Sequence, residues 1–205
     1  MTRSFDTDRF YESEFVEHRA VAEATQRALK AEFARLLAQA IATIRNGGKI
    51  MFFGNGGSAS DAQHLATELT VRYVKNRPAL AALALTTDTS ALTAIPNDIG
   101  FQRLFSRQIE ALGKQGDLAV GITTSGMSPN VLEALKVAKK IGIATACLTG
   151  KGGGKARDMA DICLIVPSAT TARIQEMHIT LGQMLCGGIE QAMGIADGPD
   201  PFGTP

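Results

Sequence analysis

Residues 49–58 read KIMFFGNGGS, and this stretch decides the fold class. Its continuously apolar start is typical of a strand that is covered on both faces, as in a parallel sheet. The strand pattern ends in GNGGS, which leads directly into a helical pattern. Small residues there let backbone amides approach a ligand, and a helix N-terminus favours an anion or a polar oxygen. A tight turn capped by Ser58 is the purely structural alternative.

Four further apolar runs follow, and helical patterns separate most of them. The five expected strands are 49–54, 79–86, 117–123, 143–149 and 162–167. The expected helices between and after them are 58–73, 89–94, 101–112, 129–140, 154–160 and 171–193. Connections of this length suit parallel crossovers. The sequence therefore predicts an α/β domain with a five-stranded parallel sheet and helices on both faces.

The segment before the first strand has a different character. Residues 8–45 contain no Gly or Pro, and apolar residues recur at a spacing of three to four, which predicts amphipathic helix in two pieces. Such a helix has no crossover to make, so its apolar stripe covers either the domain or another subunit, and we favour the second. We expect a helical oligomer-contact segment at 1–48, the α/β domain at 49–194 and a flexible tail at 195–205.

Composition excludes several classes of protein. The chain has 21 Lys+Arg and 20 Asp+Glu, so no overall field attracts it to nucleic acid or an anionic membrane. The start is not a secretory signal, and no apolar run reaches the length of a membrane span. We therefore expect a soluble cytoplasmic protein. The three cysteines form no C-x-x-C pair, which favours buried free thiols.

A second ligand loop follows the third expected strand. Residues 123–129 read TTSGMSP, so four hydroxyl groups precede a helix that Pro129 opens. Hydroxyl groups and free amides at a helix N-terminus can hold a phosphate monoester without a fixed cation. The loop also stands at the carboxyl end of a strand, where open α/β sheets bind ligands. The Gly-rich loop 149–154 has the same placement, with Lys151 as a weaker anion contact.

Two helices carry further candidates. His64 and Glu68 are spaced i, i+4, which suits two metal ligands or a base beside its partner, although ordinary helix-face pairs have the same spacing. Gln175 and Gln183 lie about 80° apart around the last helix and so share a face. His178 lies on another side and is interpreted as a structural or subunit-contact histidine.

Five segments together resemble the sugar isomerase (SIS) domain and, within it, the phosphoheptose isomerases. They are GNGGSASDAQHLATEL, ALTTDTSALTAIPNDIGF, LFSRQIEALGKQGD, TTSGMSPNV and RIQEMHI, and the resemblance covers residues 49–193. It implies an aldose–ketose isomerase that converts sedoheptulose 7-phosphate to D-glycero-D-manno-heptose 7-phosphate through an enediol. The product would serve lipopolysaccharide or a related glycan.

The resemblance also implies roles for individual residues. Glu68 would be the base, and the zinc ligands would be His64, Glu68, Gln175 and the residue at position 183. Phosphate would be held by Thr123, Thr124, Ser125 and Ser128. The rest of the sugar would contact Asn55, Gly56, Gly57, Glu68, Asn97, Asp98 and Gln175. The family is typically a homotetramer with sites between subunits.

One position departs from the family pattern. A second histidine, both zinc ligand and opposing acid/base in the family, is replaced here by Gln183. A carboxamide offers a carbonyl oxygen to zinc but cannot exchange a proton near neutral pH. Zinc should therefore bind more weakly. Loss of a general acid/base costs about 10²–10⁴ in rate, so a slow enzyme and a lost activity both remain open.

The leading hypothesis from the sequence is the isomerase, with two alternatives. One is a non-catalytic tetramer that docks the replication initiator DnaA, as the related DnaA initiator-associating protein does. The other is a sugar-phosphate sensor, although we expect no appended helix-turn-helix output domain. A dehydrogenase is disfavoured because the first loop does not fit G-x-G-x-x-G and no acidic residue closes a second strand.

Overall fold

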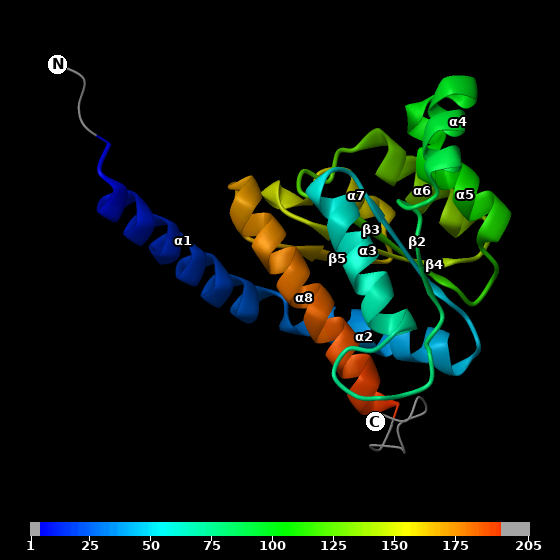
Figure 1. Cartoon of the computed structure of the whole chain (residues 1–205), viewed down its shortest axis with the longest axis horizontal. Helices are drawn as coiled ribbons and strands as arrows, with labels where there is room; N and C mark the ends of the chain where they lie inside the picture. The colour runs from blue at the N-terminus through cyan, green and yellow to red at the C-terminus, as the bar shows by residue number, and fades with distance from the viewer. Residues whose placement is uncertain (1–4, 194–205) are drawn as a thin grey trace, which may run out of the picture.

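One parallel sheet lies at the centre of the computed structural model, which describes residues 5–193 (Figure 1). Its five strands are β1 (Ile50–Gly54), β2 (Ala82–Ala84), β3 (Leu118–Thr123), β4 (Ala144–Thr149) and β5 (Ile162–Ile165). Their order is β2-β1-β3-β4-β5, and every neighbouring pair is parallel. The predicted fold class is confirmed. The edge strand β2 is shorter than its apolar run because its ladder, on β1 alone, spans three residue pairs.

The strand order creates a switch point beside β1. The chain leaves β1 to form β2 on one side of it and then returns to form β3 on the other side. The loops that follow β1 and β3 therefore leave the carboxyl ends of two neighbouring strands in opposite directions. Ligands of open α/β sheets bind in the crevice that such a divergence leaves.

Helices cover both faces of the sheet. The helices α2 (Lys30–Arg45), α3 (Gly57–Thr70) and α8 (Thr171–Ala192) pack on one face. The helices α5 (Leu104–Leu112), α6 (Pro129–Lys140) and α7 (Ala156–Met159) cover the other. The remaining elements are the N-terminal helix α1 (Thr7–Ala28), the helix α4 (Thr89–Ile99) and two short 3-10 helices, η1 (Phe101–Arg103) and η2 (Lys151–Gly153).

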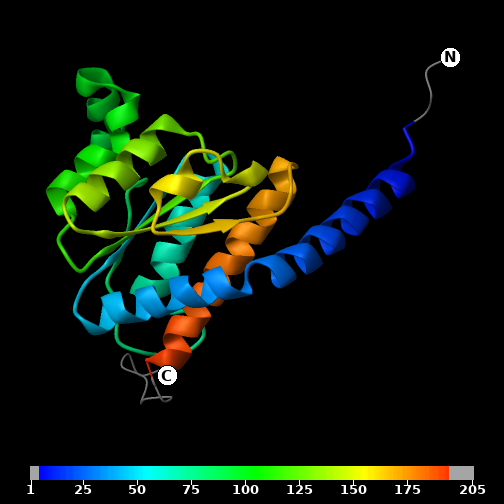
Figure 2. The same ribbon diagram turned by 180° about the vertical axis from the view of Figure 1, so that it is seen from behind.

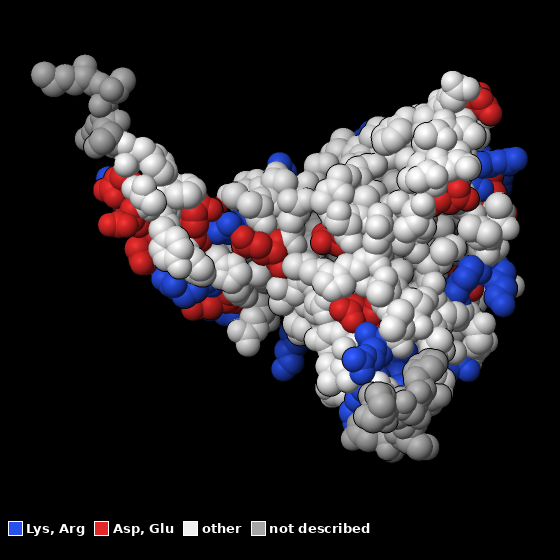
Figure 3. All heavy atoms as spheres, viewed as in Figure 1, with Lys and Arg blue, Asp and Glu red and all other residues white. Residues whose placement is uncertain are grey.

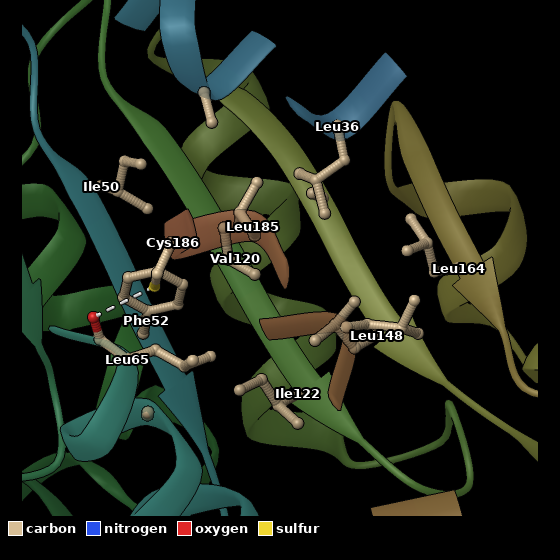
Figure 4. Close-up of a cluster of buried hydrophobic side chains, with 14 of the residues drawn as sticks. Leu36, Ile50, Phe52, Leu65, Val120, Ile122, Leu148, Leu164, Leu185 and Cys186 are labelled. Carbon is tan, nitrogen blue, oxygen red and sulfur yellow. Dashed lines mark hydrogen bonds between the residues drawn. The ribbon is translucent and has the colours of Figure 1, made fainter. Parts of the chain in front are cut away.

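The continuously apolar strands follow from this double cover. In β1, Ile50 and Phe52 face α2, α3 and α8, whereas Met51 and Phe53 face α5 and α6, and all four are fully buried. Figure 4 shows Phe52 beside Leu65 of α3 and Cys186 of α8, which belong to the same buried cluster. Burial of each such side chain stabilises the fold by about 1.5–3 kcal/mol.

The N-terminal helices extend beyond this body. The helix α1 (Thr7–Ala28) begins at Asp6, whose side chain accepts a hydrogen bond from the backbone amide of Arg9, and is followed by α2. Only Val21 and Thr25 of α1 are buried, and the helix projects from the domain (Figure 2). Charged side chains gather along it on the face shown in Figure 3. Its exposed aromatic and aliphatic residues are Phe10, Tyr11, Phe15 and Val16.

Some boundaries differ from the sequence prediction. The helix α4 continues through Pro96 to Ile99 instead of ending at residue 94, and it stops at Gly100, whose φ of 95° cannot continue a helix. Pro96 removes one backbone hydrogen bond from the interior of α4, a helix that has no buried residue. The N-cap of α3 is Gly56, and Ser58 lies inside the helix rather than capping it.

Three further expectations from the sequence concern the cysteines, membrane spans and the C-terminal tail. All three cysteines are free thiols, with Cys147 and Cys186 buried and Cys163 half-buried. Among residues 5–193, no helix is both long enough and apolar enough to cross a membrane. The predicted flexible tail at 195–205 lies outside the described residues.

Candidate active site

Two loops meet at the switch point of the sheet. The first is the glycine loop, residues 54–58, which joins β1 to α3. Gly56 has a φ of 60°, a conformation that glycine adopts without steric cost. A Cβ on Gly57 would come 2.5 Å from Nε2 of Gln175, so the absence of a side chain lets this helix end approach α8. The glycine loop and Gln175 therefore share one site.

The second is the hydroxyl loop, residues 123–128, which joins β3 to α6. Ser128 is the N-cap of α6, and Pro129 occupies the first turn, as predicted. The hydroxyl oxygens of Thr123 and Ser128 lie 2.9 Å apart, so they share one hydrogen bond. The backbone amide of Met127 donates to Oγ of Ser125 at 3.2 Å. Several hydroxyl groups thus converge at a helix N-terminus, which is a suitable place for an anion.

The Gly-rich loop after β4 and the start of α7 pack against the hydroxyl loop. The backbone amide of Ala156 donates to the carbonyl oxygen of Gly126 at 3.0 Å. Gly126 has a φ of 64°, and a Cβ there would collide with the carbonyl oxygen of Gly153. Lys151 also has a positive φ, 49°, and its amide donates to Ser168 at 3.0 Å. Its predicted contact with an anion stays a prediction.

A third group of polar atoms joins α3 to α8. Nε2 of His64 lies 2.9 Å from Oε1 of Glu68. Nε2 of Gln183 lies 3.0 Å from the same imidazole nitrogen and 3.3 Å from the same carboxylate oxygen. The close approach depends on Gly182, because a Cβ there would lie 2.6 Å from the side chain of Leu65 on α3. The structure therefore brings Gln183 into contact with His64 and Glu68, and its role as a zinc ligand stays a prediction.

The spacing of Nε2 of His64, Oε1 of Glu68 and Nε2 of Gln183 fits a zinc ion, but the amide nitrogen of Gln183 is not a zinc ligand. Ligand atoms of a tetrahedral zinc with bonds of 2.0–2.1 Å lie about 3.3 Å apart, close to the separations found here. Their hydrogen bonding is also incomplete, because a proton that His64 donates to Glu68 prevents that nitrogen from accepting from Gln183. Yet residues 5–193 hold no group of three His, Cys, Asp or Glu side chains placed to bind one metal ion. Gln183 would have to offer its carbonyl oxygen.

One carboxyl group near this cluster, that of Asp61, was expected from the sequence only to complete a helix cap with Ser58, but α3 has no side-chain cap. Asp61 lies one turn before His64 on α3, and its Oδ2 is buried with no hydrogen-bond partner among the described residues. Burial raises the pKa of Asp61, and the nearby His64 opposes the shift. The i, i+3 spacing to His64 was the available signal. A perturbed carboxyl group in such a position is typical of functional sites.

Asn97 and Asp98 are not brought to the loops. They lie exposed at the end of α4, where Nδ2 of Asn97 donates to Oδ1 of Asp98 at 2.7 Å. Asp98 lines a separate hollow of about 640 Å³ with Arg103 and Arg107. No hydrogen bond of the described chain joins either residue to the glycine loop or the hydroxyl loop. Their predicted contact with a sugar stays a prediction.

His178 does not belong to the site. It is fully buried on α8, and burial lowers its pKa to about 4. The imidazole is therefore neutral at pH 7. Its position agrees with the structural interpretation that the sequence offered.

Known proteins share this architecture over most of the chain. The sequence model of the SIS domain matches residues 14–150. The phosphoheptose isomerase of Paramagnetospirillum magneticum is 56% identical over 181 residues, which are 88% of this chain and 94% of that protein.

Two solved structures agree. The phosphoheptose isomerase of Neisseria gonorrhoeae superposes with a TM-score of 0.86 at 43% identity and that of Francisella tularensis with 0.88 at 36%; each comparison covers 91% of this chain and 100% of the other. Matches of this identity and extent show that the chain belongs to the SIS domain family and, within it, to the phosphoheptose isomerases.

Proposed function

We propose that the protein is a cytoplasmic aldose–ketose isomerase that converts sedoheptulose 7-phosphate to D-glycero-D-manno-heptose 7-phosphate, a heptose precursor for lipopolysaccharide or a related glycan. The observation that carries the proposal is the position of Glu68. Its carboxylate is mostly shielded, with 18% of the side chain exposed, and stands on the helix that the glycine loop opens. A base in this place lies beside a sugar whose phosphate rests on the hydroxyl loop.

The chemistry required of the residues is proton transfer. Glu68 removes a proton from C1 of the ketose, which gives the 1,2-enediol, and the same carboxylic acid returns a proton to C2. A hydroxyl proton must also pass from O1 to O2. Gln183 acts neither as an acid nor as a base near neutral pH, and His64 is assigned to zinc, so water carries this step.

Zinc is part of the proposal. His64, Glu68, Gln175 and Gln183 would hold it, and a bound zinc ion would polarise a substrate oxygen as a Lewis acid. The two carboxamides replace stronger ligands, so we expect weak binding. Isothermal titration of the apoprotein with zinc measures it. Gln183→His should bind zinc at least tenfold more tightly, and equal affinities would contradict the ligand set.

Turnover of sedoheptulose 7-phosphate tests the activity. The parent should form heptose 7-phosphate, measured by NMR, and Glu68→Gln should lose about 10²–10⁴ in rate because the amide keeps the shape but not the base. Glu23→Gln, the same change at an exposed position of α1, is the matched control and should leave the rate unchanged.

Two outcomes would overturn the assignment. One is an inactive parent with zinc added and an equally inactive Gln183→His variant. The other is a Glu68→Gln variant as active as the parent. A parent that binds the sugar phosphate without turning it over would favour the non-catalytic alternative.

The proposed assembly is a homotetramer. Support comes from α1, whose Tyr11 and Phe15 expose 59% and 46% of their surface, and from an apolar groove of about 570 Å³ between α1, α2 and α8. Exposed aromatic stripes of this kind are typical of subunit contacts. Light scattering should give four subunits for the parent. Replacing Tyr11 and Phe15 by Glu should lower that number, and Glu12→Ala should not; a monomeric parent would contradict the assembly.

A further inference from the structure

A reciprocal pair of carboxamides joins the two ligand loops. Nδ2 of Asn55 donates to Oδ1 of Asn130 at 2.9 Å, and Nδ2 of Asn130 donates to Oδ1 of Asn55 at 2.8 Å. Asn55 belongs to the glycine loop, and Asn130 is the second residue of α6, just after the hydroxyl loop. The two residues are 75 positions apart in the chain. The pair therefore spans the switch point between β1 and β3.

A third hydrogen bond fixes the orientation of this pair. Two facing carboxamides would bond equally well if both were turned by 180°, because each offers one donor and one acceptor. The backbone amide of Val131 donates to Oδ1 of Asn130 at 3.0 Å, which only the carbonyl oxygen can accept. The orientation of Asn130 is therefore determined, and through it that of Asn55.

The fixed orientation decides what Asn55 can present to a ligand. The pair uses one N–H of its amide and one lone pair of its oxygen, so one of each remains. Asn130 is 1% exposed and cannot itself reach a ligand, whereas Asn55 is only half-buried. A carboxamide held in this way offers a donor and an acceptor in known positions without losing side-chain entropy on binding.

We propose that Asn130 is a positioning residue of the active site: it orients Asn55 toward the sugar and sets the distance between the glycine loop and the hydroxyl loop. The inference rests on the proposed isomerase function, since the oriented amide is assigned to the sugar of a sugar phosphate. Because Asn130 acts through Asn55, removal of the Asn130 amide should have little further effect once the Asn55 amide is absent.

A double-mutant cycle tests this coupling. Asn130→Ala leaves the Asn55 amide without a fixed orientation, and Asn55→Ala removes that amide, so each should lower kcat/KM for sedoheptulose 7-phosphate by about 10- to 100-fold. In the Asn55→Ala background, Asn130→Ala should add less than about a threefold loss. Effects that multiply would overturn the inference.

A stability control separates positioning from folding. Leu135→Ala removes a fully buried side chain from the same helix and should destabilise the protein without a comparable loss of kcat/KM. If Leu135→Ala lowers kcat/KM as strongly as Asn130→Ala, the role of Asn130 is merely structural and the inference fails.

The same variants distinguish the inference from the proposed function. Failure of the parent to turn over sedoheptulose 7-phosphate overturns the function. The cycle is then measured in the dissociation constant of the same compound by calorimetry, where coupled losses at positions 55 and 130 support the inference and independent losses overturn it.

Discussion

The substitution Glu190→Ala tests how the end of α3 is held in place. Glu190 lies on α8, is 3% exposed, and accepts a hydrogen bond from Nε of Arg77 at 2.8 Å. It also accepts from three successive backbone amides of the segment after α3, at 3.0–3.3 Å, those of residues 73–75. Arg77 in turn donates to the carbonyl oxygen of Glu68 at 2.6 Å. The ion pair thus supports the residue that we propose as the base.

The expected loss of stability follows from burial. Alanine leaves a guanidinium group with no exposed surface without its counter-charge, and removal of one partner of a buried pair costs about 3–5 kcal/mol. For a chain of this size, a loss of about 4 kcal/mol corresponds to a fall in Tm of about 12 °C. Glu68 should also lose position, so turnover should fall.

Urea unfolding at one fixed protein concentration measures the effect, because subunit association makes stability concentration-dependent. The control is Glu23→Ala, which removes an ion pair with Arg27. The side chains of Glu23 and Arg27 are 68% and 72% exposed, so this variant should change the unfolding free energy by less than about 1 kcal/mol. A loss below about 1 kcal/mol for Glu190→Ala would refute the reasoning.

The same group predicts a pH dependence. Burial raises the pKa of Glu190, but hydrogen bonds from the backbone amides and from Arg77 outweigh burial and hold the pKa below its usual value. The stabilisation is therefore complete above the pKa of the unfolded chain and is lost as pH falls through the lower pKa of the folded state. Glu190→Ala should lack this acid-side loss.

Two further predictions concern single residues. Gly126→Ala should weaken binding of the sugar phosphate and destabilise the protein by more than Gly47→Ala does. Both glycines have a positive φ, but only a Cβ at position 126 would meet other atoms. Equal losses of affinity in calorimetry and of stability in urea unfolding would contradict the steric argument. The second prediction concerns His178, whose pKa is about 4 in the folded protein and about 6.5 in the unfolded chain. As pH drops from 6.5 to 4, the unfolded chain binds a proton at this histidine and the folded protein does not, so the unfolding free energy should fall by up to about 3 kcal/mol. His178→Gln should remove that slope, and an unchanged slope would show that His178 does not cause it.

The sequence by itself determined the fold class and the two ligand loops. Five apolar runs without alternation indicated strands covered on both faces, and the structure has that double cover, with Met51 and Phe52 in opposite layers. The glycine loop and the hydroxyl loop were recognisable because helix starts, glycines and hydroxyl groups act locally, within a few residues of the chain. Helix ends were less well determined, as Pro96 illustrates.

Only the tertiary structure decided which of these residues meet. The Asn55 and Asn130 amides are 75 residues apart, and Gln183 reaches His64 across 119 residues because Gly182 lets α8 pack closely against α3. The exposed stripe of α1 likewise depends on where that helix leaves the domain (Figure 2). Such contacts are set by strand order and by the packing of helices on the sheet, which no local periodicity encodes.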